Sequence, residues 1–113
     1  MTKSANDGAA RELRFPLFER YPALAAVLPR VLLGVFPTPV ERLRHMGHER
    51  LWIKREDQSS PVYGGNKVRK LEFTLAEAMR QGCAKVVTMG GLGTSHGLAT
   101  AIFGGQLGMS TRL

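Results

Sequence analysis

The sequence predicts an α/β fold built on parallel strands, and two observations support this prediction. From residue 51 onward the apolar pattern alternates between strand and helix. This alternation is typical of parallel strands joined by right-handed helical crossovers. In addition, the 113 residues include 13 glycines, more than the roughly 7% of an average protein, and many of them follow residue 63. We therefore expect tight turns and ligand loops in the second half of the chain.

The first half of the chain has weaker patterns. Residues 1–14 carry few apolar side chains, so we expect them to be disordered. Residues 17–28 favour a short helix that prolines break into pieces. A brief apolar run over 31–36 leads to a Pro-Thr-Pro sequence at 37–39, which predicts an extended turn before residues 40–43.

Regular structure is predicted from residue 51. Residues 51–55 form a strand, and a polar loop follows. The next segment is a helix marked by apolar residues at helical spacing, namely Val68, Leu71, Leu75 and Met79. Its acidic residues Glu72 and Glu77 are expected to be solvated, and Gly82 gives a stop signal. Residues 85–89 then read as a short buried strand.

A glycine-rich loop at 90–93 leaves this strand, and Ser95 is the expected cap of the next helix. That helix, over about 96–107, is apolar on most faces and ends at Gly108. Residues 109–113 resemble the approach to a further strand. Small parallel sheets with open edges are rarely stable alone, so we expect residues 15–113 to be the N-terminal portion of a larger, truncated enzyme domain.

Charge and composition narrow the function classes. The net charge of +7 comes from basic residues that are scattered and interleaved with acidic ones. No aromatic residues are spaced among the cations as a base-stacking surface requires, which argues against nucleic acid. Attraction of small anionic molecules is the favoured use of the charge.

Metal, disulfide and membrane roles also find little support. Cys83 is the single cysteine, which rules out an internal disulfide framework and a thiolate-rich metal site, and we expect an inert thiol. His45 and His48 are three residues apart but lack further ligands, so we expect surface histidines. No apolar run approaches a membrane span and the N-terminus lacks a signal-peptide core, so a cytoplasmic location without membrane partners is expected.

The most informative stretch begins Gly64-Gly65-Asn66-Lys67. Glycines allow close backbone approach, and asparagine is a preferred N-cap. A helix start favours an anion and disfavours the protonated form of a lysine, whose amine must be neutral to attack a carbonyl. Lys67 and Lys70 would face one side of the first turn. This arrangement would suit pyridoxal phosphate (PLP), whereas the spacing alone favours an ordinary solvated lysine pair.

The loop over residues 90–96 joins a strand to a helix, which is where ligands bind in open α/β sheets. Its amides and hydroxyls could hold a phosphate or a carboxylate. His96 stands where the last glycine of a dinucleotide-binding fingerprint would be, and Lys67 does not fit a Walker A loop. A tight turn with a capped helix would explain the same residues equally well.

Four segments in order, residues 37–43, 51–57, 64–72 and 90–96, resemble the 1-aminocyclopropane-1-carboxylate (ACC) deaminase and D-cysteine desulfhydrase family of PLP-dependent enzymes. The resemblance runs from about residue 15 to the end. It implies part of the three-layer parallel-sheet fold of the fold type II, tryptophan-synthase-β-like enzymes. The Gly-Gly-Asn-Lys-x-Arg-Lys-Leu-Glu run is its most specific motif.

The resemblance also implies roles for individual residues. Lys67 would bond PLP covalently through its amine, and Asn66 and Lys70 would contact the cofactor, Lys70 at its phosphate. Thr94, Ser95 and His96 would hold the substrate carboxylate. Family members commonly carry an asparagine at the Ser95 position, where it touches the PLP ring hydroxyl. Here Ser95 offers a shorter side chain.

The implied reaction is β-elimination or deamination of a small amino acid such as D-cysteine or ACC. It would release ammonia and a keto acid, with sulfide as well from D-cysteine, while Lys67 transfers protons. The full-length enzyme is expected to be a homodimer. The 113-residue chain alone is expected to be at most barely active and to bind PLP weakly. The alternatives are a non-catalytic α/β module that binds a small anion, and a truncated product without a stable fold.

Overall fold

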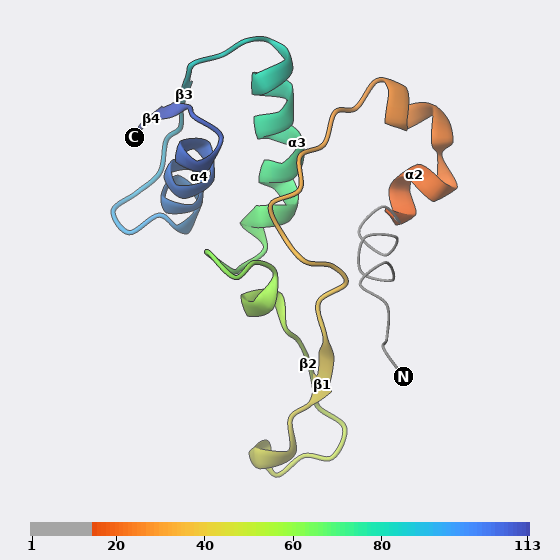
Figure 1. The fold of residues 1–113 in the computed structure, drawn as a ribbon. Helices are drawn as coiled ribbons and strands as arrows, with labels where there is room; N and C mark the ends of the chain where they lie inside the picture. Colours follow the sequence, from red (N-terminus) through yellow and green to blue (C-terminus); the bar gives the residue numbers. More distant parts are fainter. Residues whose placement is uncertain (1–14) are drawn as a thin grey trace, which may run out of the picture.

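The computed structural model describes residues 15–113, so the expected disorder of residues 1–14 lies outside the described residues. In chain order the elements are α2 (Pro16–Arg20), η1 (Pro22–Ala26), β1 (Val40–Arg42), η2 (Arg44–Met46), β2 (Trp52–Lys54), η3 (Glu56–Gln58), α3 (Lys67–Arg80), β3 (Lys85–Val87), α4 (Ser95–Gln106) and β4 (Ser110–Arg112). The η elements are 3-10 turns. Figure 1 shows α3 and α4 side by side, with the β1–β2 hairpin projecting away from them.

Strands β3 and β4 pair in parallel, with Lys85 opposite Ser110 and Val87 opposite Arg112. Helix α4 connects them, so the predicted parallel crossover is confirmed for this pair. The final segment is itself a strand rather than the approach to one.

The prediction for the strand at 51–55 is only partly correct. Strand β2 does form there, but it pairs antiparallel with β1, Val40 lying opposite Lys54, in a separate two-stranded sheet. The short connection over residues 43–51 allows the chain to turn back directly, which antiparallel neighbours can do and parallel ones cannot. The described residues therefore form a mixed α/β structure with small sheets, which supports the three-layer parallel fold only in part.

The core lies between α3 and α4. Its buried hydrophobic residues are Val68, Leu71 and Leu75 of α3, Ala99 and Phe103 of α4, and Met109 before β4. The helical spacing over 68–79 is thus confirmed. Met79 is the exception at 47% exposed, because it belongs to the last turn, beyond the end of the core.

Helix α4 also packs closely on the β3–β4 pair. A Cβ added to Gly104 would come within 2.9 Å of the Thr111 hydroxyl oxygen, so the glycine lets the helix approach the sheet. The predicted burial of the strand at 85–89 is wrong for this chain. Val87 is 70% exposed, because nothing else in residues 15–113 covers that part of the sheet.

Glu72 contradicts the expectation of a solvated helix charge, since it is only 1% exposed. Its carboxylate accepts hydrogen bonds from Arg30 (2.7 Å) and from the backbone N–H groups of Leu33 and Gly34 (3.1 Å each). The backbone carbonyl of Glu72 also accepts from the N–H of Val31. Glu72 therefore binds the apolar run at 31–36 to α3 through three backbone N–H groups of that run.

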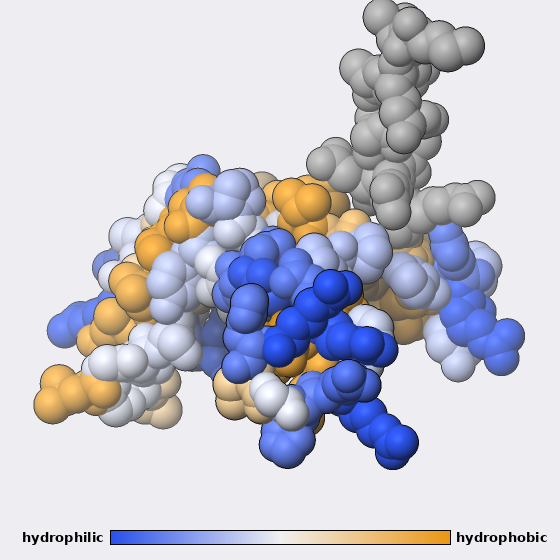
Figure 2. Space-filling view, turned by 90° about the horizontal axis from the view of Figure 1, so that it is seen from below, coloured by the Kyte–Doolittle hydropathy of each residue, from blue (hydrophilic) through white to orange (hydrophobic). Residues whose placement is uncertain are grey.

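The hairpin carries much of the basic surface. Seen from the hairpin end, hydrophilic side chains gather at the centre of the face (Figure 2), and Arg42, Arg44 and His48 line a hollow there. His45 and His48 are exposed, as predicted. Within residues 15–113, no three His, Cys, Asp or Glu side chains come together as metal ligands would. The same part of the chain contains no helix long and apolar enough to cross a membrane.

Candidate functional site

Lys67 is the first residue of α3. It is partly exposed and Lys70 is exposed, and neither amine has a hydrogen-bond or ion-pair partner within residues 15–113. Asn66 occupies the N-cap position, but its side chain makes no capping hydrogen bond, so that part of the prediction is wrong. The two amines are therefore available to a ligand at the start of the helix.

The turn before Lys67 requires its two glycines. Gly65 adopts a φ of +118°, a conformation that L side chains rarely adopt. A Cβ added to Gly64 would overlap the backbone carbonyl of Asp57. The sequence signal at this turn therefore reflects both a special backbone conformation and a close approach of two chain segments.

An ion pair between Arg69 and Glu56 holds the first turn of α3, two residues after Lys67. The Glu56 carboxylate accepts two hydrogen bonds from the Arg69 guanidinium, at 2.7 and 2.8 Å, and a third from the Thr38 hydroxyl. The hydrogen bonds from Arg69 are the main cause that lowers the pKa of Glu56 from 4.5 to about 2. The Arg69 guanidinium also stacks on the ring of Phe36, 4.1 Å from its centre.

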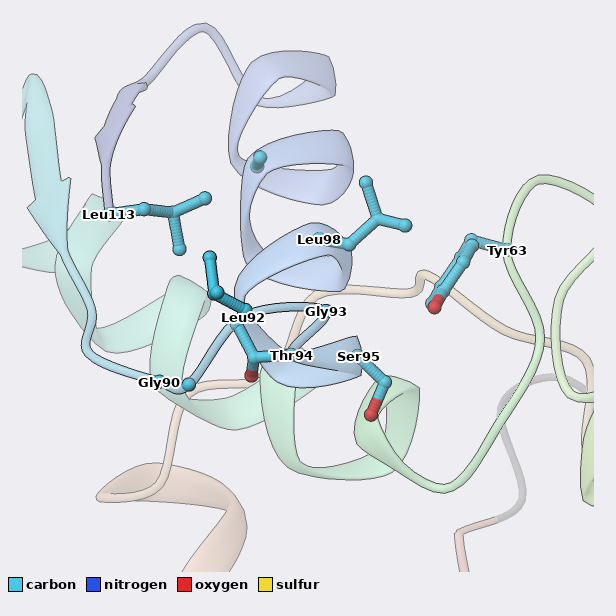
Figure 3. Close-up of a pocket in the computed structure, with 10 residues that line it drawn as sticks. Tyr63, Gly90, Leu92, Gly93, Thr94, Ser95, Leu98 and Leu113 are labelled. Atoms are coloured by element: carbon cyan, nitrogen blue, oxygen red, sulfur yellow. The ribbon is translucent and has the colours of Figure 1, made fainter.

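A pocket of about 440 Å³ lies beside the glycine-rich loop. Residues 90–95 line it together with Tyr63, Leu98, Ala101 and Leu113. Figure 3 shows the Tyr63 ring across from Leu98, with the phenol hydroxyl directed toward the side of Ser95. Tyr63 was not predicted as a site residue from the sequence, although its position as an aromatic residue next to a double-glycine turn could have indicated it.

The two hydroxyl residues of the loop differ in role. Thr94 is the N-cap of α4, because its side-chain oxygen accepts a hydrogen bond from the Gly97 N–H at 3.3 Å. Ser95 is the first helical residue, so the prediction that it caps the helix is wrong. Its hydroxyl makes no hydrogen bond to any residue of the described chain and lines the pocket. Ser95 is therefore the freer of the two to bind a ligand.

The structure brings only some of the predicted site residues together. Thr94 and Ser95 share the pocket, whereas Asn66, Lys67, Lys70 and His96 are not among its lining residues. Tyr63, four residues before Lys67, connects the pocket to the start of α3. The Nδ1 atom of His96 is buried without a hydrogen-bond partner among residues 15–113.

These features define an α/β protein with a lysine amine that has no partner among residues 15–113 at one helix start and a hydroxyl-bearing glycine loop at another. The family of pyridoxal-phosphate dependent enzymes matches this sequence over residues 31–113. The chain belongs to this family.

Individual relatives agree with this assignment. The chain is 43% identical to nocardicin C-9' epimerase of Nocardia uniformis subsp. tsuyamanensis, covering 72% of this chain and 25% of the relative. It is 41% identical to D-cysteine desulfhydrase of Klebsiella pneumoniae subsp. pneumoniae, covering 72% of this chain and 26% of that relative. A crystal structure of an ACC deaminase homologue is similar with a TM-score of 0.69 and 34% identity, covering 87% of this chain and 30% of that one. The chain thus spans about a quarter of the length of the curated relatives it matches.

The residues present fit PLP by their chemistry. The cofactor needs an amine for its aldehyde and cationic or N–H donors for its phosphate. Lys67 and Lys70 supply two amines without partners in the described chain, and the start of α3 supplies free backbone N–H groups. The Ser95 hydroxyl and the buried Nδ1 of His96 add polar atoms that are not used within residues 15–113.

Proposed function

We propose that this chain carries the cofactor-bonding lysine of a PLP-dependent enzyme that acts on a small amino acid by β-elimination or deamination, of the D-cysteine or ACC type. The observation that carries the proposal is Lys67. Its amine has no partner among the described residues, and it starts α3 directly after the Gly64-Gly65 turn, inside the segment that matches the family. A homodimer is the assembly we expect for a full-length enzyme.

In this proposal each predicted residue has a defined task. Lys67 bonds the cofactor aldehyde through Nζ, and Lys70, beside Asn66 and the N–H groups of α3, neutralises the phosphate. Ser95 and Thr94 donate their hydroxyls to the substrate carboxylate or the cofactor ring. His96 is the third residue that we propose to hold the substrate carboxylate.

PLP, when bound, withdraws electrons from the carbon that carries the substrate amine. Lys67 Nζ would be the group placed to take the proton from that carbon. The same amine can return a proton later in the reaction. The described residues therefore contribute an anchor and a proton carrier.

Epimerisation is a second candidate, favoured by the similarity to nocardicin C-9' epimerase. It uses the same first proton transfer, but the proton returns to the opposite face and no group leaves. Measuring keto acid and sulfide release from D-cysteine against solvent deuterium uptake at the α-carbon distinguishes the two outcomes.

Borohydride reduction in the presence of PLP, followed by peptide mass spectrometry, tests the anchor. We expect an adduct at Lys67 that disappears in Lys67→Ala and persists in the control Lys85→Ala, whose lysine lies on β3. An adduct spread evenly over the lysines would contradict the proposal. It would favour a module that binds small anions without catalysis.

A further inference from the structure

Lys67 lies midway between Gly65 and Arg69, and both of these residues are bound by Glu56 of the turn η3. The backbone N–H of Gly65 donates a hydrogen bond of 2.7 Å to the backbone carbonyl of Glu56. The carboxylate of Glu56 accepts two hydrogen bonds from Arg69. One residue of η3 therefore holds the chain two positions before Lys67 and two positions after it.

Ser59 reinforces the first of these contacts. It ends η3 and is completely buried. Its hydroxyl donates to the carbonyl of Gly65 at 2.8 Å and accepts from the Gly65 N–H at 3.0 Å. Both backbone groups of Gly65 are thus bound to one side chain. A glycine has many accessible conformations, so these bonds select the single one from which α3 begins.

Ser59 is itself anchored to a third segment. Its backbone carbonyl accepts a hydrogen bond of 2.8 Å from the N–H of Val35. A Cβ added to Gly34 would collide with the same carbonyl oxygen, so the segments are tightly opposed. The turn that holds Lys67 is therefore fixed to the body of the protein.

We propose that Glu56 and Ser59 are positioning residues for Lys67, and this inference rests on the proposed function of that lysine. The Lys67 amine has no partner within residues 15–113, so the backbone of the first turn of α3 sets the direction in which the side chain leaves. Reactions between bound groups lose about 100-fold in rate when the reacting atoms are misplaced by about 1 Å. Loosening η3 therefore reduces the reactivity of Lys67 without removing any atom of the site.

The test uses the 113-residue chain, PLP and borohydride, and measures the ratio of adduct at Lys67 to adduct at Lys70 within the same molecules. We expect Ser59→Ala and Glu56→Gln to lower this ratio on the order of tenfold. Two neighbours serve as matched controls. Ser60 is also buried, but its hydroxyl accepts from the N–H of Val62, and the exposed Asp57 pairs with the half-buried Arg55. Ser60→Ala and Asp57→Asn are expected to leave the ratio unchanged.

A further variant separates positioning from general destabilisation. Arg69→Lys keeps the charge at a side chain that is 40% exposed, but cannot form the two-pronged contact with Glu56. It is expected to fold, as judged by helical circular dichroism, and still to lower the ratio.

The outcomes distinguish this inference from the function on which it rests. If the unmodified chain shows no preference for Lys67 over Lys70, the proposed function fails before any variant is compared. A second outcome is that the unmodified chain prefers Lys67 and that three folded variants keep this preference, namely Ser59→Ala, Glu56→Gln and Arg69→Lys. In that case the proposed function stands and the positioning role is overturned. Loss of the preference in these variants, with both controls unaffected, supports the positioning role.

Discussion

Arg30 and Glu72, 42 positions apart in the sequence, form an ion pair with a nitrogen-to-oxygen distance of 2.6 Å. The two side chains are 11% and 1% exposed, so the pair is nearly removed from water. Removing one partner of a buried pair leaves an uncompensated charge, which costs about 3–5 kcal/mol. We expect Arg30→Ala to lower the free energy of unfolding by that amount in urea denaturation.

The exposed pair Glu77–Arg80 provides the comparison for this prediction. Arg80 is 63% exposed and lies one turn from Glu77 on the surface of α3. Exposed pairs contribute about 0–1 kcal/mol, so Arg80→Ala is expected to change stability by less than 1 kcal/mol. Equal effects of Arg30→Ala and Arg80→Ala would show that the burial of Glu72 does not matter energetically.

Gly64 and Gly91 give a second matched comparison. A Cβ at Gly64 would overlap the backbone of Asp57, whereas a Cβ at Gly91 would meet nothing within 4 Å. Overpacking of this kind costs about 1–3 kcal/mol, and rigid backbone atoms place Gly64→Ala at the upper end. Thermal unfolding is expected to show a clear loss for Gly64→Ala and little change for Gly91→Ala. A tolerated Gly64→Ala would mean that the two segments can separate easily.

Stability is expected to fall in acid partly through Glu56. Its pKa is lowered from 4.5 to about 2 in the folded chain. The stabilisation that ionised Glu56 gives the folded chain is therefore present above about pH 4.5 and is lost as the pH falls toward 2. Because Arg69 is 40% exposed, solvent screening reduces the contribution to on the order of 2 kcal/mol. Urea denaturation at pH 7 and pH 2.5 should show a smaller pH effect in Glu56→Gln than in the unmodified chain.

The start of α4 tests which hydroxyl caps the helix. Removing an N-cap side chain costs about 1 kcal/mol, so Thr94→Ala is expected to lower stability by this amount. Thr94→Ser keeps the capping oxygen and should retain most of the stability that the cap contributes. Ser95→Ala should be nearly neutral, since the Ser95 hydroxyl makes no hydrogen bond within residues 15–113. A larger effect from Ser95→Ala would restore the capping role predicted from the sequence.

Local patterns predicted the two long helices well, because apolar spacing and a terminating glycine depend only on residues that are close in the sequence. Helix α3 ends just before Gly82, with a φ of +70°, and α4 just before Gly108, with a φ of +77°. The parallel pairing of β3 with β4 followed from the helix between them. The sequence also pointed to Lys67 at a helix start.

The features that were missed depend on contacts between distant residues. Glu72 has the spacing of a solvated helix charge, and only its partner Arg30 and the amides of Leu33 and Gly34 explain its burial. The antiparallel pairing of β1 with β2 depends on a loop without a distinctive turn motif. Tyr63 faces the loop at 90–95 only because α3 packs against α4.

The contacts around α3 also reach beyond residues 31–113, the segment that the family model matches. The family match begins at residue 31, whereas Arg30 and the ring of Phe15, which lies 5.6 Å from that of Phe73, come before it. A domain boundary drawn at residue 31 would therefore cut through the packing that supports α3, so expression of this part of the chain should start ahead of Phe15.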